Sequence, residues 1–194
     1  MFIELTDILR CPAEHEEHFL VLLPDGVSDR QVESGQLGCL ECGLVFPVKG
    51  GVAEFGPAPS DVRASDALTG PAMAALLGLG GPGGYVALVG GVAKDWASFS
   101  TAVEGVHVVA VDPPPGTPAG RGLSVVRGGR LPVRSRQLRG VVLGPGFADD
   151  PAWLADAVRT LLPGLRLVGE GATPSAPELE VLASADGVWV ARVR

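Results

Sequence analysis

The 194-residue sequence lacks the features of a secreted or membrane-spanning protein. Its N-terminus has no cationic start followed by an apolar run and a small-residue cleavage site, so it does not resemble a signal peptide. No uninterrupted apolar stretch reaches the roughly 18–20 residues needed to span a bilayer. Three cysteines, an odd number, do not suit a disulfide framework. We therefore expect a cytoplasmic protein that does not associate with membranes.

Positive charge and catalytic motifs are also scarce. The net charge is −7, whereas binding to a phosphate backbone requires clustered Lys and Arg. One basic strip does occur, at Arg127, Arg130, Arg134, Arg136 and Arg139. We interpret this strip as a solvated strand-and-loop edge and expect no nucleic-acid partner. There is no G-x-S-x-G, Walker A loop or H-E-x-x-H, and no pair with the spacing of a nucleophile and its base, so no catalytic residue is assigned.

The chain divides into two parts of different character. Residues 1–56, the N-terminal segment, contain all three cysteines and two of the three histidines. Residues 57–64 carry prolines, a serine and an aspartate and are interpreted as a linker. In residues 65–194, the α/β segment, strand-like and helix-like stretches alternate, which is typical of a parallel sheet. The length and the apolar content of 46% suit one α/β domain with a small appendage.

In the α/β segment the expected elements follow from apolar runs and the residues that break them. Helices are expected at 65–79, 95–103 and 150–162, and strands at 85–89, 106–111, 123–126, 138–143 and 165–168. The last helix has the clearest ends, because Asp149 or Asp150 can cap it and Pro163-Gly164 ends it. Asp186-Gly187 predicts a turn that joins two further strands in a hairpin.

The cysteines of the N-terminal segment predict a zinc site. Cys39 and Cys42 form a C-x-x-C-G knuckle, whose spacing directs two thiolates at one metal. Cys11 precedes a proline, as in a CP-x-C knuckle, but the position of that knuckle's second cysteine holds Glu14. His15 follows directly and completes a chemically sound Cys3His set of Cys11, His15, Cys39 and Cys42, with Glu14 and His18 as alternative fourth ligands.

The N-terminal segment resembles a known family. The stretches LTDILRCP and GQLGCLECGLVFPVKGGVAEF are similar to the small zinc-ribbon proteins that activate tRNA and protein methyltransferases, and to their bacterial relatives. Those proteins typically end in Y/F-P-[IV]-x-x-G-[IV]-P, a pattern filled here by Phe46-Pro47-Val48 and Gly51-Val52. The resemblance implies a zinc-binding β module and a protein partner, because such proteins cover an apolar patch on a catalytic partner. In this chain the module can instead pack on the segment fused to it.

The α/β segment resembles class I methyltransferases that use S-adenosylmethionine. A helix with LTGPAMAALLGL precedes the strand VALVGG, and a second strand ends in an acid in VVAVDPPP. The stretches VVRGGRLPVRSRQLRGVVLG and WLADAVRTLLPGLRLVG follow in the family's order, and the hairpin fits the antiparallel pair that closes such sheets. The resemblance implies a Rossmann-like, mostly parallel sheet with a C-terminal antiparallel hairpin, preceded by the zinc-ribbon-like module.

The residues that would bind the cofactor depart from the family's pattern. The acid that usually ends the first strand is replaced by Leu88, and two glycines of its loop by Val92 and Lys94, where the cofactor needs bare backbone. Only Gly90 and Asp112 remain in place, Asp112 where the family binds ribose hydroxyls. The acid for the adenine amine is missing near Gly128-Gly129, so S-adenosylmethionine is not counted among the expected cofactors.

These features predict a non-catalytic pseudo-methyltransferase that acts as a scaffold, assembly or partner-binding subunit. Its partner would be a protein, such as a methyltransferase or a larger complex, or a second copy of the chain. Two alternatives are a methyltransferase with an atypical cofactor pocket and a module that binds another small ligand. An open pocket beside Gly90 and Asp112 would favour the enzyme, whereas the scaffold predicts that Val92 and Lys94 fill that space.

Overall fold

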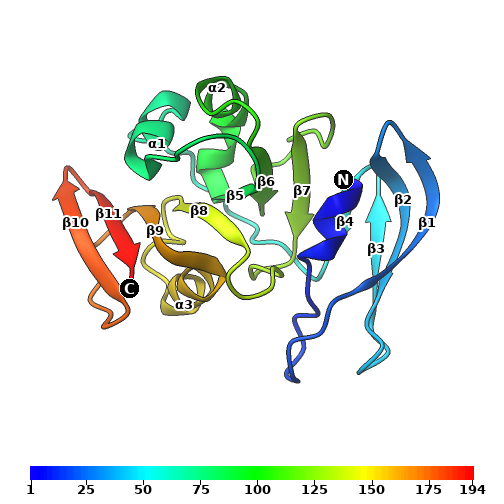
Figure 1. Cartoon of the computed structure of the whole chain (residues 1–194). Helices are drawn as coiled ribbons and strands as arrows, with labels where there is room; N and C mark the ends of the chain where they lie inside the picture. The colour runs from blue at the N-terminus through cyan, green and yellow to red at the C-terminus, as the bar shows by residue number, and fades with distance from the viewer.

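The computed structural model describes residues 1–194 as one sheet with helices on both faces (Figure 1). Its strands are β1 (Val21–Ser28), β2 (Gln31–Gly38), β3 (Val45–Lys49), β4 (Val52–Glu54), β5 (Tyr85–Val89), β6 (His107–Val111), β7 (Leu123–Arg127), β8 (Leu138–Leu143), β9 (Leu161–Glu170), β10 (Leu179–Ala185) and β11 (Val188–Val193). Its helices are α1 (Gly70–Leu77), α2 (Trp96–Ala102) and α3 (Pro151–Thr160), with 3-10 turns η1 (Ile3–Asp7) and η2 (Gly90–Asp95). No helix is long and apolar enough to cross a membrane.

The strands of the α/β segment lie in the order β7-β6-β5-β8-β9-β11-β10. The first five are parallel, and within the segment their order is 3-2-1-4-5, as in a Rossmann-type sheet. Strand β11 pairs antiparallel with β9, and β10 pairs antiparallel with β11. Helices α1 and α2 cover one face and α3 the other (Figure 1). This arrangement confirms the predicted fold class.

The predicted elements are largely present, with shifted ends. Helix α1 begins at Gly70 and not at residue 65, because Thr69 caps it by accepting a hydrogen bond from the Ala72 N–H. Helix α3 is capped by Asp150, whose carboxylate accepts the Ala152 N–H at 2.8 Å. The strand predicted at 165–168 is longer, since β9 starts directly after α3.

The N-terminal segment extends the same sheet. Strands β1, β2, β3 and β4 form an antiparallel meander, and β4 then pairs in parallel with β7 through Val52–Val125 and Ala53–Val126. Between β4 and α1 the chain, which includes the predicted linker 57–64, forms no helix or strand. The division into residues 1–56, 57–64 and 65–194 stays a prediction about folding units.

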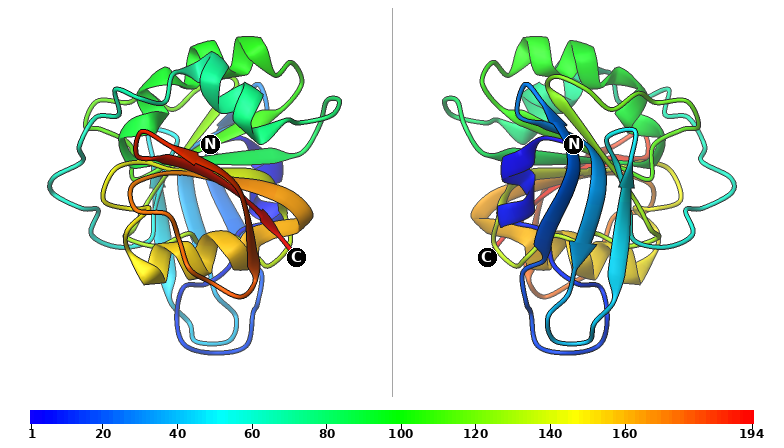
Figure 2. Two further views of the ribbon diagram at one scale, coloured as in Figure 1. Left: turned by 90° about the vertical axis from the view of Figure 1, so that its left-hand side faces the viewer. Right: turned by 90° about the vertical axis from the view of Figure 1, so that its right-hand side faces the viewer.

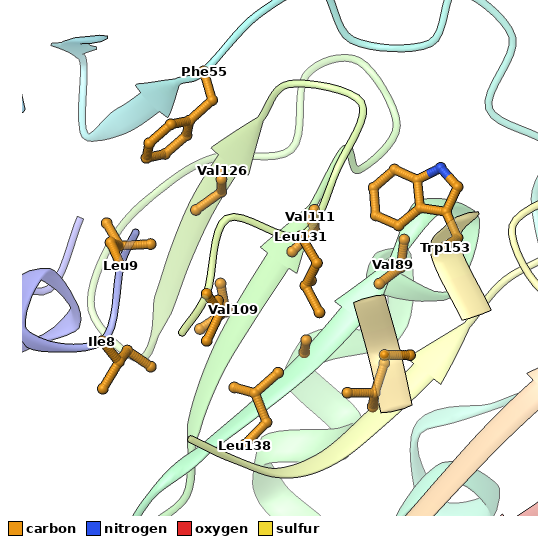
Figure 3. Packing of buried hydrophobic residues seen from close by; sticks show 14 of the residues in the cluster. Ile8, Leu9, Phe55, Val89, Val109, Val111, Val126, Leu131, Leu138 and Trp153 are labelled. Carbon is orange, nitrogen blue, oxygen red and sulfur yellow. The ribbon is translucent and has the colours of Figure 1, made fainter. Parts of the chain in front are cut away.

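The two segments share one hydrophobic core on the α3 face of the sheet. Buried side chains of the N-terminal segment, including Leu9 and Leu37, belong to the same cluster as Val109 and Val126. Leu9 also forms an isolated β-bridge with Val133 of the α/β segment. Figure 3 shows Leu9 and Phe55 at one side of this cluster and Trp153 at the other. Folding of the N-terminal segment therefore buries part of the α/β segment's surface.

Candidate metal centre and cofactor cleft

The candidate metal ligands lie on two neighbouring loops at one end of the N-terminal segment (Figures 1 and 2). One loop holds Cys11 and His15 and leads into β1, and the other joins β2 to β3 through Cys39 and Cys42. The second turn is closed by backbone bonds from the Cys39 N–H to the Leu44 carbonyl at 2.9 Å and from the Gly43 N–H to the Cys39 carbonyl at 3.0 Å. This local geometry makes both thiols face the first loop.

The four ligand atoms lie within 4.8 Å of one another. The Cys11 and Cys42 sulfurs are 3.6 Å apart, and the Cys39 sulfur is 3.5 Å from His15 Nε2. Tetrahedral zinc with its usual bond lengths requires about 3.8 Å between two thiolates and about 3.6 Å between a thiolate and an imidazole nitrogen. The donor set and these two separations therefore fit a tetrahedral Zn²⁺ site.

Hydrogen bonds around the cluster orient the His15 ring and shift the pKa values of His15 and Cys39. His15 Nδ1 donates to the Glu16 carbonyl at 2.6 Å, because a carbonyl oxygen can only accept, and this leaves Nε2 free to face Cys39. That bond is the main reason that the pKa of His15 is raised. Burial tends to raise the pKa of Cys39, but backbone N–H groups of Cys42 and Glu41 outweigh it and lower the pKa to about 7. Burial raises the pKa of Cys11 to about 12.

The two other candidate ligands lie outside the cluster. Glu14 is exposed and is not among the grouped donors. His18 Nε2 lies 3.7 Å from a carboxylate oxygen of Glu41. Of the three residues considered for the fourth position, the structure brings His15 to the thiols.

The second candidate site lies at the carboxyl ends of β5 and β6, where ligands bind in Rossmann-type sheets. Asp112, directly after β6, is fully buried and has a positive φ of 43°. Its Oδ1 accepts the Gly128 N–H at 2.9 Å and its Oδ2 accepts the Gly129 N–H at 2.8 Å. Burial raises the pKa of Asp112, although these two bonds and Arg127 oppose the shift. Asp112 is the residue expected to bind the cofactor's ribose, and both of its carboxylate oxygens thus accept hydrogen bonds from the chain itself.

The glycine loop after β5 is covered as well. A Cβ added to Gly90 would lie 2.3 Å from the Phe147 ring, and one added to Gly91 would lie 1.9 Å from the Arg63 carbonyl oxygen. Phe147 is only 6% exposed, and its ring packs edge-on against Trp153 with centroids 5.0 Å apart. The glycines therefore allow other groups to approach the backbone closely. The segments that approach it here are the chain's own linker and the loop between β8 and α3.

Two residues expected to fill this space behave differently. Val92 is fully buried, in the core on the α1 and α2 face. Lys94 points outward instead, 3.6 Å from Asp66, and fills no pocket. The sequence reasoning missed Phe147 and Arg63, which cover the loop. The only signal for Phe147 was an aromatic residue four positions after the end of β8. A cleft of about 530 Å³ lies beside Phe147 and Arg63, but neither Gly90 nor Asp112 lines it.

Comparison with known proteins gives a family match within the N-terminal segment. Residues 3–51 match the family described as Trm112p-like protein. No curated protein sequence matches the chain. Among solved structures, a complex of the Haloferax volcanii Trm112 methyltransferase activator with a protein described as a methyltransferase is 19% identical, with a TM-score of 0.41. The match covers 56% of this chain and 61% of that one, so this chain spans less than two thirds of that structure.

Two further structures are methyltransferases. One, from Geobacter sulfurreducens, is 14% identical with a TM-score of 0.49, and the match covers 68% of this chain and 82% of that chain. The antibiotic-resistance methyltransferase Kmr is 13% identical with a TM-score of 0.43, covering 69% and 99%. At these values we draw no argument about activity from the structures. The chain thus joins a segment that matches the Trm112p-like family to an α/β segment with a Rossmann-type sheet.

Proposed function

We propose that this protein is a non-catalytic, methyltransferase-like subunit that acts through its surface as a scaffold or partner-binding component. The observation that carries the proposal is the bonding of Asp112, whose two carboxylate oxygens accept the Gly128 and Gly129 N–H groups. Asp112 is fully buried, so a cofactor ribose could reach its oxygens only if the chain around it opened and both bonds broke. Hydrogen bonds to a charged group contribute about 1.5–3 kcal/mol each, so the displacement costs about 3–6 kcal/mol.

This cost is a large part of the free energy of binding of a typical cofactor. A cofactor held with micromolar affinity gains about 8 kcal/mol. Subtracting the displacement cost leaves about 2–5 kcal/mol, which corresponds to a dissociation constant of roughly 0.2 mM or weaker. Phe147 over Gly90 and the Arg63 backbone over Gly91 add a steric barrier, because both lie where a bound cofactor would approach the chain. The alternative of a methyltransferase with an atypical pocket would need all of these contacts to open.

The N-terminal segment has a structural role in this proposal. Cys11, His15, Cys39 and Cys42 would hold Zn²⁺ as a four-coordinate site with no open position, so the metal supplies a structural cross-link. The solved Haloferax complex pairs a Trm112 activator with a separate protein. Here we propose that the corresponding partnership is made within one chain, where β4 pairs with β7 and both segments share a core. The three free cysteines suit a reducing compartment, and we propose a cytoplasmic location.

The test is calorimetric titration of the full chain, with its zinc content measured, against S-adenosylmethionine and S-adenosylhomocysteine. We expect no heat and no thermal shift up to millimolar ligand. Micromolar binding that is lost in Asp112→Asn, a variant of equal size, would overturn the proposal and favour the atypical methyltransferase. A circular dichroism spectrum of Asp112→Asn shows whether that variant is folded, and Asp186→Asn in the exposed hairpin turn is the matched control.

A further inference from the structure

One face of the N-terminal segment is apolar and uncovered. In the right-hand view of Figure 2, strands β1, β2 and β3 face the viewer and no helix lies over them. Large apolar side chains are exposed here: Phe19 is 56% exposed, Leu23 61% and Val45 55%. Leu40, in the knuckle between Cys39 and Cys42, is 80% exposed. A contiguous group of exposed apolar side chains often marks an interaction surface.

The strand register places these residues together. Leu22, Leu37 and Phe46 are cross-strand neighbours that point into the core. The neighbouring row, Val21, Gly38 and Val45, must therefore point outward, as must the row that contains Leu23, Gln36 and Pro47. Gly38 has no side chain, so the centre of the face is open between Val21 and Val45. We call Phe19, Val21, Leu23, Val45 and Pro47 the outer face.

The net negative charge of the protein belongs to the segment that carries this face. The N-terminal segment has ten acidic and three basic side chains, whereas residues 57–194 have twelve of each. The whole net charge of −7 therefore belongs to the N-terminal segment. Its three basic side chains are each paired with an acid of the same segment, Arg10 with Glu17, Arg30 with Glu4 and Lys49 with Glu54. Three thiolates and one neutral imidazole on Zn²⁺ would add one further negative charge.

Most possible occupants of the outer face conflict with these observations. All residues of the chain are placed, and none of them covers it. A second copy docked face to face would bring together two segments that each carry a net charge of −7, which is unfavourable. An anionic lipid surface or a nucleic acid would be repelled for the same reason. A protein with an apolar patch inside a basic surface complements both the exposed apolar side chains and the net negative charge of the segment.

We propose that the outer face is a docking site for a protein partner that presents an apolar patch rimmed by Lys and Arg. This inference rests on the proposed partner-binding function and names its surface and the chemistry of its ligand. The metal cluster supports the site from one end, because Leu40 lies between two of its ligands and the Leu44 carbonyl accepts the Cys39 N–H. The β4 edge that joins the α/β segment is not part of this surface, so both contacts can exist at once.

The experiment compares three forms of the tagged full chain: wild type, Leu23→Ser/Val45→Ser, and the control Val181→Ser/Leu182→Ser. The control removes two aliphatic side chains that are also exposed, 41% and 40%, from β10 at the opposite edge of the sheet. Proteins retained from an extract of the source cells by wild type but not by the outer-face variant are identified, purified and titrated against all three forms. Each titration is repeated at about 50 mM and about 300 mM salt, which changes the screening of surface charge.

We expect a purified basic protein to bind wild type and the β10 control equally, to bind the outer-face variant at least tenfold more weakly, and to lose affinity in high salt. The inference is overturned if no retained protein depends on the outer face, if the purified partner binds both variants equally, or if salt leaves its affinity unchanged. Concentration-dependent light scattering that the outer-face variant abolishes would instead identify a second copy as the occupant. Titration of the same samples with S-adenosylmethionine tests the proposed function separately, because it does not involve the outer face.

Discussion

Coupling between the two segments can be tested through the tryptophans. Trp96, Trp153 and Trp189 all belong to the α/β segment, so tryptophan fluorescence reports the unfolding of that segment alone. Leu37, on β2 of the N-terminal segment, is fully buried. We predict that Leu37→Ala lowers the stability that the tryptophans report, because both segments contribute to one core.

The size of the effect follows from burial. Truncation of a fully buried leucine to alanine costs about 2–5 kcal/mol, and a central value of about 3 kcal/mol is expected for a site within a three-strand row. A chain of this length unfolds in urea with a slope of roughly 2–3 kcal/mol per molar. The tryptophan-reported midpoint should therefore fall by about 1 M urea. Far-UV circular dichroism, which reports both segments, should show the same midpoint if the unfolding is cooperative.

The matched control is Leu23→Ala, which truncates the same side chain where it is 61% exposed. An exposed substitution changes stability by about 0.5 kcal/mol or less, so its midpoint should move by about 0.2 M at most. The reasoning would be refuted if Leu37→Ala left the tryptophan midpoint unchanged while circular dichroism showed a separate, earlier transition. That result would mean that the N-terminal segment unfolds alone and does not stabilise its neighbour.

Three further predictions concern the cofactor cleft, the metal and pH. Phe147→Ala should cost about 3–5 kcal/mol in urea unfolding and still show no calorimetric heat with S-adenosylmethionine, because Asp112 stays bonded; micromolar binding would show that the ring alone closes the cleft. Cys39→Ser should lose the zinc found by metal analysis, lower the melting temperature and make it insensitive to a chelator; unchanged metal content would contradict the ligand assignment. Burial lowers the pKa of His107 to about 4, so its neutral form stabilises the fold above a pH of about 6.5 and this contribution declines as pH falls toward 4. His107→Gln should therefore lose less melting temperature than wild type between about pH 7.5 and about pH 5, and equal losses would rule this explanation out.

The sheet could be predicted because its strands are short apolar runs with clear ends. The run at 106–111 is β-branched and stops at Asp112 and a series of prolines, and Asp186-Gly187 adopts the two positive φ angles that its hairpin turn requires. The cluster of Cys11, His15, Cys39 and Cys42 could be predicted for a related reason. A C-x-x-C turn brings its own two thiols together, and the proline after Cys11 indicates a second knuckle of the same kind.

The contacts that close the cofactor cleft could not be predicted, because the backbone makes most of them. The partners of Asp112 are the N–H groups of Gly128 and Gly129, and no side-chain pattern encodes them. In the sequence, the same two glycines indicate only that an acid is missing. The Arg63 carbonyl that covers Gly91 also belongs to the backbone, so the sequence does not indicate its position. Strand β4 is only three residues long, so no alternation of apolar residues in the sequence indicates its pairing with β7.

Fusion also decides how the N-terminal segment can act on other proteins. A tethered module meets its attached neighbour at an effective concentration in the millimolar range, so β4 stays paired with β7 and is not free to pair with another protein. Any action on a partner must then use the outer face or the α/β segment. Leu23→Ser/Val45→Ser and Leu37→Ala separate these roles, because the first changes the exposed face and the second changes the shared core. If the first variant loses the partner at an unchanged tryptophan midpoint, docking and stabilisation reside on opposite faces of the same three strands.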